Sequence, residues 1–232
     1  MEKQQAPRPP GRYRHEYKYP ISYPDYLVLT QKLRTLMRRD SHADENGSYR
    51  ITGLYFDNCF DKALKEKLHG VNRREKFRLR YYGENSDTVF LEKKQKINEL
   101  CLKNSALLTR GDCMRILRGE LEVLECLSEP LLAEFVFKQR TQLLRPSSVV
   151  RYVREPYVYE PGNVRVTFDS QLSTGLCVDS FFDPAPTPIT DGSMIMELKY
   201  DEFLPQIIRE LVQPYCPQLQ AFSKYAACRT MA

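Results

Sequence analysis

The sequence lacks tryptophan, has only three histidines, and contains no glycine-rich phosphate-binding motif. Neither GxxxxGK[ST] nor GxGxxG occurs, which excludes the P-loop and the dinucleotide-binding cradle. The histidines, His15, His42 and His69, are widely spaced, so a histidine-based metal site is not expected. Any phosphate chemistry must therefore be carried by other side chains.

Paired cysteines and long apolar runs are also missing. The seven cysteines are scattered without a CxxC pair, which disfavours a zinc site or a disulfide framework and favours a reducing compartment. No apolar run approaches the roughly 18–20 residues that span a bilayer. Residues 1–11 are polar and proline-rich, unlike a signal peptide. We expect a cytoplasmic protein with a disordered leader over residues 1–11 and one domain over residues 12–232.

The composition is that of a globular domain with a small excess of positive charge. Hydrophobic residues make up 42% of the 232 residues, charged residues make up 28%, and the formal net charge is +5. So small an excess favours an anionic ligand only if the basic side chains gather in one place. Because the charge is modest and no RNP-like motif occurs, nucleic acid is not an expected partner.

Strands dominate the expected secondary structure, with helices between and after them, which predicts an α+β fold with a largely antiparallel sheet. Periodicity and turn residues predict helices at 22–39, 61–69, 110–127, 204–213 and 222–230. The predicted strands are 13–19, 49–57, 76–82, 88–96, 133–144, 151–159, 163–172 and 193–200.

Several of these strands alternate charged and apolar residues. Residues two apart share a face of a strand, so Arg78 and Arg80 lie on one face and Phe77 and Leu79 on the other. The same alternation aligns basic residues with an occasional acid elsewhere: Glu16 with Lys18, Glu92 with Lys94 and Lys96, Lys138 with Arg140, Arg165 with Asp169, and Glu197 with Lys199.

For any one strand, a solvated charged face is the simpler interpretation. The whole series favours another, because arginine is typical of forked contacts to phosphate or carboxylate. We therefore predict an antiparallel β tunnel barrel with a basic lumen, flanked by helices that cover the apolar faces. In an empty lumen of this kind the basic side chains repel one another, so a polyanion is the expected occupant.

Five short motifs resemble the vacuolar transporter chaperone (VTC) domain, a member of the CYTH-like triphosphate tunnel metalloenzymes. They are RLRYYG at 78–83, VFLEKK at 89–94, RVTFD at 165–169, ELK at 197–199 and FSKY at 222–225. The resemblance runs from about Arg12 to Arg229. It implies a tunnel that binds ATP, triphosphate or polyphosphate with Mn²⁺ or Mg²⁺, and polyphosphate synthesis from ATP as the best-known activity of this branch.

The resemblance also implies roles for individual residues. Lys224 is the lysine required for activity in the polymerase branch, and Glu197 is the metal-binding glutamate, with Glu16 a further candidate. The implied phosphate-gripping arginines are Arg78, Arg80, Arg140 and Arg165. The implied substrate-binding residues are Lys18, Lys94, Lys103, Lys199 and Ser223.

Each role has a simpler alternative. Glu197 with Lys199 fits an ion pair, Glu16 fits a salt-bridge partner of a lining arginine, and Lys224 fits an exposed helix lysine. Asp169 is expected to orient an arginine rather than to bind metal.

Two departures from the family pattern stand out. The superfamily opens with Glu-x-Glu-x-Lys, whereas this chain has Arg14 in the first position, followed by Glu16 and Lys18. A base therefore replaces one metal-binding acid, which favours the VTC branch over a simple triphosphatase. Ala221 stands where the polymerase pattern often has a second lysine.

Three functions remain open from the sequence: a polyphosphate polymerase, an inorganic or nucleoside triphosphatase, and a non-catalytic polyphosphate-binding module. Coupling of synthesis to export would require a separate membrane protein partner.

Overall fold

The computed structural model describes residues 12–122, 129–175, 181–182, 187–189, 194–215 and 222–231. The predicted leader, residues 1–11, lies outside them. No helix in these ranges is long and apolar enough to cross a membrane.

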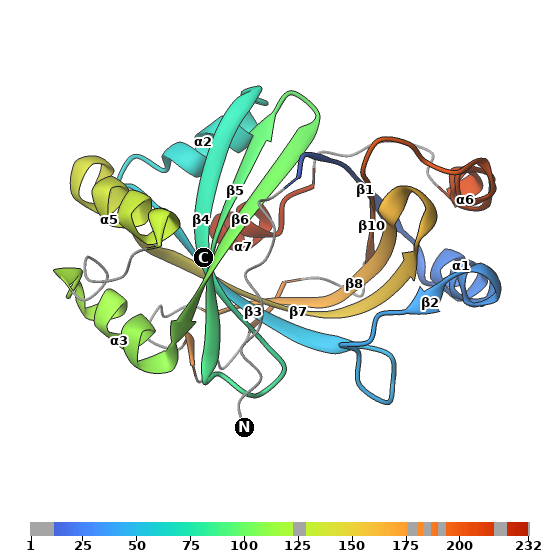
Figure 1. Cartoon of the computed structure of the whole chain (residues 1–232), viewed down its shortest axis with the longest axis horizontal. Helices are drawn as coiled ribbons and strands as arrows, with labels where there is room; N and C mark the ends of the chain where they lie inside the picture. The colour runs from blue at the N-terminus through green and yellow to red at the C-terminus, as the bar shows by residue number, and fades with distance from the viewer. Residues whose placement is uncertain are drawn as a thin grey trace.

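Ten strands form a single sheet, with helices packed around it (Figure 1). The strands are β1 (Arg14–Ile21), β2 (Arg38–Arg39), β3 (Tyr49–Asp57), β4 (Arg73–Tyr82), β5 (Thr88–Ile97), β6 (Leu100–Thr109), β7 (Arg145–Tyr159), β8 (Val164–Gly175), β9 (Thr187–Pro188) and β10 (Met194–Tyr200). The helices are α1 (Tyr23–Leu36), α2 (Lys62–Leu68), α3 (Arg110–Arg118), α5 (Pro130–Gln142), α6 (Gln206–Val212) and α7 (Lys224–Met231).

The sheet closes on itself. Its strand order is β2-β7-β3-β4-β5-β6-β1-β10-β8-β9, and an additional antiparallel β7–β8 pairing joins the two ends. Every strand of the ring except short β2 and β9 therefore has a partner on both sides, as in a barrel. All pairings are antiparallel. The predicted fold class, an antiparallel tunnel barrel flanked by helices, is confirmed.

Two hydrophobic cores lie on the outside of the ring. One joins β4, β5 and β6 to α3 and α5, with Phe77, Leu91 and Phe135 at its centre. The other joins β1, β8 and β10 to α1 and α6, through residues such as Leu29 and Met196. Because the helices cover the apolar faces of the strands, the charged faces are turned inward.

A third core lies inside the ring and is formed by α7. Tyr225 and Cys228 of this helix pack against Ile51, Val150 and Tyr152. The register pairs Ile51 with Tyr152, so these two residues share the inner face of β3 and β7. Helix α7 thus occupies part of the barrel interior, and its first residue, Lys224, lies beside the charged part.

The predicted strand over 133–144 is wrong, because residues 133–142 belong to helix α5, which ends before Leu143. Pro130 occupies the first turn of the helix, where its missing N–H costs nothing. The buried residues Leu131, Leu132, Phe135 and Val136 follow helical spacing. The alternation of Val136 to Arg140 was therefore coincidental.

One further strand and one helix end differ from expectation. The sequence analysis predicts no strand at β6. The helix predicted over 110–127 begins with a capping box between Thr109 and Asp112 but ends at Gly119, whose φ of 81° stops α3. Residues 123–127 of that prediction lie outside the described residues.

Candidate functional site

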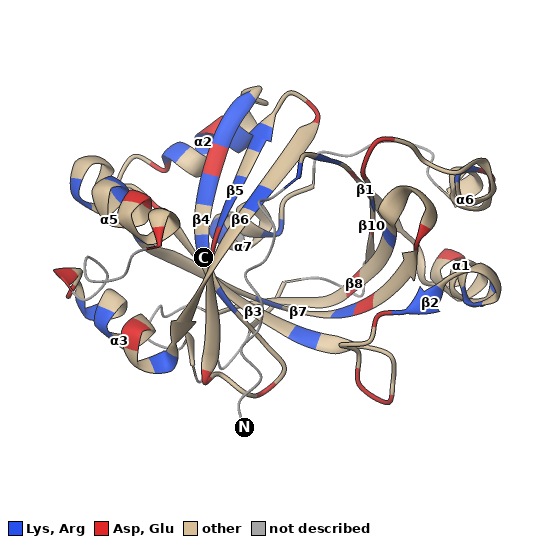
Figure 2. Ribbon diagram, in the orientation of Figure 1, with Lys and Arg blue, Asp and Glu red and all other residues tan. Residues whose placement is uncertain are grey.

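Seven of the eight ring strands, all except β3, and helix α7 contribute basic residues to the inner face of the ring. Figure 2 marks the positions of the Lys and Arg residues along these strands. Cross-strand partners share a face, so the register identifies this set. Arg78 pairs with Glu92, Lys76 with Lys94, Lys94 with Lys103, and Glu16 with Lys199. The inward basic residues include Lys18, Lys76, Arg78, Arg80, Lys94, Lys103, Arg154, Arg165, Lys199 and Lys224. The inward acids are Glu16, Glu92, Asp169 and Glu197.

Glu16 and Glu197 form the first ionic cluster, between β1 and β10. Lys18 Nζ lies 3.4 Å from Glu16 and 3.7 Å from Glu197, and Lys199 Nζ lies 3.1 Å from Glu197. Lys94 also binds Glu16. Burial and the nearby Glu197 carboxylate act to raise the pKa of Glu16, but the three lysines outweigh them and lower it to about 2. Burial likewise acts to raise the pKa of Glu197, but Lys199 and Lys18 hold it well below its ordinary value, so both carboxylates are ionised at neutral pH.

Glu92 on β5 is the centre of the second cluster. Arg78 Nε donates to its carboxylate at 2.7 Å, Lys103 Nζ at 3.0 Å, and Arg80 Nε lies 3.5 Å away. Burial alone would raise the pKa of Glu92, but Arg80 and Lys103 lower it. Only 2% of the Glu92 side chain is exposed, so this single acid neutralises part of a strongly basic, desolvated surface.

Asp169 on β8 holds the third cluster. Arg154 binds it through two nitrogens, Nε and Nη2, at 2.7 Å each, and Nη2 also reaches Glu197 at 2.8 Å. Asp169 thus orients an arginine, as predicted. Lys224 Nζ lies 2.5 Å from Asp169 and 4.7 Å from the centroid of the Tyr152 ring.

The position of Lys224 depends on how α7 is anchored. Its neighbour Tyr225 donates a 2.7 Å hydrogen bond to Asp57 at the end of β3. The Asp57 carboxylate also accepts from the backbone N–H groups of Ala63 and Leu64, which fixes the start of α2. Tyr225 stacks on Tyr55 at 5.1 Å, and the Tyr55 hydroxyl accepts from Arg78 at 2.7 Å. The contacts of Asp57 and Tyr225 therefore fix the positions of α2, α7 and the Arg78 side chain relative to one another.

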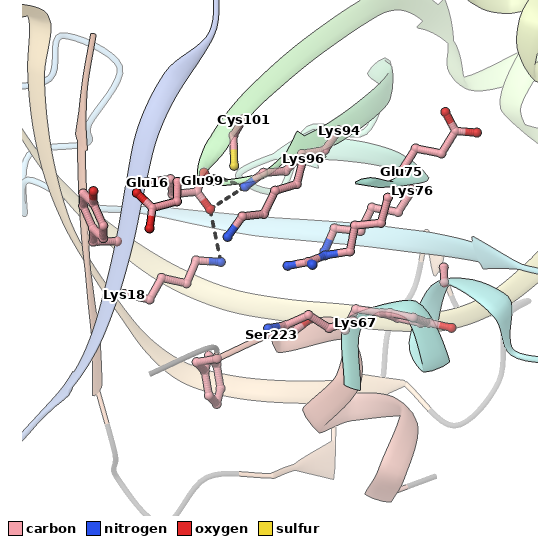
Figure 3. Close-up of a pocket in the computed structure, with 15 residues that line it drawn as sticks. Glu16, Lys18, Lys67, Glu75, Lys76, Lys94, Lys96, Glu99, Cys101 and Ser223 are labelled. Carbon is pink, nitrogen blue, oxygen red and sulfur yellow. Dashed lines mark hydrogen bonds and ion pairs between the residues drawn. The ribbon is translucent and has the colours of Figure 1, made fainter. Parts of the chain in front are cut away.

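A cavity of about 210 Å³ opens onto this inner face (Figure 3). It lies between the ends of β4, β5 and β6, strand β1, and helices α2 and α7. Its basic lining residues are Lys18, Lys67, Arg74, Lys76, Lys94 and Lys96. Glu16, Glu75 and Glu99 are the acids of the lining, so positive charge predominates.

Three lysines around the inner face have depressed pKa values. Burial, helped by the nearby Arg74, lowers the pKa of Lys67 to about 8. Burial also lowers the pKa of Lys199 to about 8, although Glu197 opposes the shift. Burial and the charges of Lys94 and Lys18 hold the pKa of Lys76 well below its ordinary value. An anion entering the cavity would favour the charged form of all three.

We therefore expect triphosphate binding at pH 8 to take up protons, with Lys67 contributing. Lys67 and Lys199 are partly neutral at that pH in the free protein, and the bound anion raises their pKa values again. Affinity should accordingly fall as pH rises above 8. The measurement is titration calorimetry in buffers of different ionisation enthalpy, comparing the wild type with Lys67→Met. Proton release by the ligand is common to both proteins, so a difference of about half a proton reports Lys67. Equal uptake by the two proteins would contradict this expectation.

The structure brings together most of the residues predicted for the site. Lys18, Lys94, Lys103, Lys199, Arg78, Arg80, Glu16, Glu197 and Lys224 all lie in the three ionic clusters. Arg165 lies at the edge of the inner face, where it binds Asp40 and lies 3.4 Å from the Tyr49 hydroxyl. Ser223 lines the cavity, and its hydroxyl accepts from the Ala226 N–H at 3.3 Å at the start of α7. Their roles toward a ligand stay predictions.

Arg140 is the exception. It lies exposed on helix α5, which packs on the outside of the barrel. The prediction that Arg140 lines the lumen is wrong, because it depended on a strand over 133–144 that is a helix.

Sequence reasoning missed three inward residues: Lys67, Lys76 and Arg154. Lys76 precedes Arg78 by two residues, so the same alternation would have found it. Arg154 lies within a predicted strand and would have emerged from its pairing with Asp169. Lys67 lies on α2, whose position is fixed by the Asp57 contacts, and no local pattern indicates it.

A divalent metal would find two neighbouring carboxylates here, Glu16 and Glu197. No cluster of three or more His, Cys, Asp or Glu side chains suited to a metal occurs in the described part of the chain. Two buried carboxylates with lysines between them fit an ion that takes its other ligands from phosphate oxygens and water, as Mg²⁺ commonly does. They do not fit a metal held by protein side chains alone.

The comparisons with known proteins agree with this geometry. The barrel is similar to a protein from Bacillus halodurans described as a "putative adenylate cyclase", with a TM-score of 0.55, 13% identity, and coverage of 93% of this chain and 96% of that one. It is also similar to the PH1819 protein of Pyrococcus horikoshii, with a TM-score of 0.50, 14% identity, and coverage of 94% and 99%. No curated protein sequence matches the chain. At these identities the structures show a common fold only.

The sequence profile of the VTC domain family covers residues 13–232, nearly the entire chain. Its extent agrees with the resemblance carried by the five motifs, all of which lie inside it. The chain therefore belongs to the VTC domain family.

Proposed function

We propose that this protein is a polyphosphate polymerase that transfers the γ-phosphate of ATP to a growing polyphosphate chain inside the barrel. One observation carries the proposal: basic residues from separate strands and from α7 converge on one inner face, where they outnumber the inward carboxylates of the described strands. A polyanion is the ligand that such a surface fits.

Phosphoryl transfer requires in-line positioning and neutralisation of charge rather than a covalent protein group. Arg78 and Arg80 would grip successive phosphates, and each already projects a guanidinium onto the inner face beside Glu92. Lys224 would neutralise the transferring phosphoryl group, since it is buried and fixed between Asp169 and the Tyr152 ring. The acceptor is the terminal phosphate of the existing chain, so no serine or cysteine nucleophile is needed.

Mn²⁺ or Mg²⁺ would be held by Glu197 and Glu16, and when bound it would supply charge neutralisation at the phosphate oxygens. Lys18 and Lys199 contact these carboxylates in the metal-free arrangement, so they would turn toward phosphate oxygens when a metal and ligand enter. A membrane protein partner would couple synthesis to export.

A triphosphatase is the second candidate function, favoured by the same phosphate-binding face. A non-catalytic polyphosphate-binding module is the third. They differ from the polymerase in their products, because only the polymerase makes long chains.

The test is incubation of the full chain with ATP and Mn²⁺, followed by separation of the products by gel electrophoresis. We expect chains that lengthen with time as ADP accumulates. Orthophosphate as the only phosphate product would replace the proposal with a triphosphatase. Binding of polyphosphate with no change in ATP would replace it with a binding module.

A further inference from the structure

The inner face of β4, β5 and β6 changes its chemistry from one end to the other. One end carries Lys76, Lys94 and Lys96 and opens into the basic cavity. At the other end, the same face carries Tyr82, Phe90 and Leu107. The register pairs Phe90 with Arg80 on one side and with Leu107 on the other, which puts these side chains next to one another.

This apolar end is accessible. Leu107 is 60% exposed and Tyr82 is 37% exposed. Within the described residues, β1 pairs with β6 only at Leu100 and Cys101, so β1 does not cover the part of β6 that carries Leu107. Exposed large apolar side chains beside a charged site are typical of ligand contacts.

The aromatic rings are joined to the phosphate-binding residues. Tyr82 meets Phe90 edge-on, with ring centroids 5.9 Å apart, and meets Tyr49 in the same manner at 5.7 Å. Arg80 Nη1 donates to the Tyr82 hydroxyl at 3.1 Å, and its guanidinium lies 5.6 Å from the centre of that ring. Arg80 is itself buried against Glu92. The aromatic end therefore begins where the cationic clusters end.

We propose that Tyr82, Phe90 and Leu107 form the subsite for the base of a nucleoside triphosphate, whose phosphates extend toward Arg80 and Arg78. This inference rests on the proposed function, and it adds the orientation of the nucleotide and the residues that recognise its ring. A nucleoside triphosphate is a flat ring at one end and a polyanion at the other. The inner face of β4, β5 and β6 likewise has an aromatic end followed by a basic end. Polyphosphate, which has no ring, would contact only the basic end.

The chemistry of the subsite also predicts its selectivity. Tyr82 and Phe90 offer ring surfaces, Leu107 offers methyl groups, and the Tyr82 hydroxyl is already engaged by Arg80. Stacking of this kind depends on ring area and tolerates different bases. We therefore expect purine nucleotides to bind more tightly than pyrimidine nucleotides, with little difference between ATP and GTP.

The test compares ATP with inorganic triphosphate, which has no ring, in a metal-free buffer that prevents turnover. Leu107→Ala and Phe90→Ala should each weaken ATP binding several-fold, and the double variant should weaken it about tenfold or more. Triphosphate affinity should change by less than about twofold. Phe203→Ala is the control, because Phe203 is 58% exposed but lies after β10, away from this face. Leu107→Ala keeps the test valid should Phe90→Ala unfold, because the Leu107 side chain is mostly solvent-exposed.

A second readout uses the absence of tryptophan from the chain. Tyr82→Trp introduces a single indole, and we expect ATP to quench its fluorescence more strongly than triphosphate at equal saturation. Equal quenching by the two ligands, or parallel losses of ATP and triphosphate affinity in the alanine variants, would overturn the base subsite. Because these measurements need no product, they remain informative if the polymerase proposal fails, and a failure of chain synthesis leaves them unchanged.

Discussion

Replacing Glu92 with glutamine is expected to lower the free energy of unfolding by about 3 kcal/mol, and added triphosphate is expected to restore most of the loss. The Glu92 side chain is 2% exposed and contacts Arg78, Arg80 and Lys103. Among the described residues, Glu92 is the only carboxylate paired with these three cations, so the glutamine leaves their mutual repulsion without an offsetting charge. Breaking a buried ion pair by removing one partner is strongly destabilising for this reason.

Triphosphate would supply the missing negative charge. At a free concentration of 100 times its dissociation constant it stabilises the folded state by about 2.7 kcal/mol. The measurement is urea unfolding of Glu92→Gln with and without triphosphate. Glu120→Gln is the matched control, since Glu120 is a half-exposed acid beside Arg118 on the surface and should lose little. If the two variants were equally stable without the anion, Glu92 would not be the counter-charge of the inner face.

Lys224→Met is expected to reduce the rate of phosphoryl transfer about a hundredfold or more while leaving triphosphate affinity within about tenfold. Lys224 is 7% exposed and its Nζ lies 2.5 Å from Asp169. Asp169 keeps both hydrogen bonds from Arg154 after the substitution, so no buried carboxylate is left without a partner and the fold should survive. A loss confined to the chemical step indicates that the ammonium group acts on the transferring phosphoryl group.

The measurements are the rate of chain synthesis at saturating ATP and the affinity for triphosphate. Lys32→Met provides the control, because Lys32 lies exposed on α1, outside the barrel. An unchanged rate in Lys224→Met would contradict a catalytic role for this lysine and would favour a binding module.

The alternation of charged and apolar residues along each strand predicts much of this site. In a closed barrel, the inner faces of all strands line the same interior, so residues two apart in any strand reach one site. Arg78, Arg80, Lys94 and Lys199 face inward because the helices cover the opposite, apolar face of each strand. The rule needs only residues two apart. It therefore succeeds wherever the strand itself is correctly predicted.

The same rule fails where helices and tertiary contacts decide. Residues 136–140 alternate like a strand, but Pro130 and the buried residues at helical spacing make this segment α5. Strand β6 carries Leu100, Leu102, Ala106 and Leu108 outward, yet its inner face mixes Cys101, Lys103, Ser105 and Leu107, so no charge pattern marks it. Lys67 reaches the cavity only because Asp57 fixes α2 beside α7.

The closure of the ring is uneven, and this sets where the barrel is weakest. Within the described residues, β1 and β6 share two residue pairs, Arg14 with Cys101 and His15 with Leu100, whereas β5 and β6 share ten. Backbone amides at the β1–β6 junction are thus expected to exchange with solvent sooner than those elsewhere in the ring. Separation of β1 from β6 would widen the barrel interior while every other strand pairing persisted. Thermal fluctuations in the width of the interior should therefore originate at this junction.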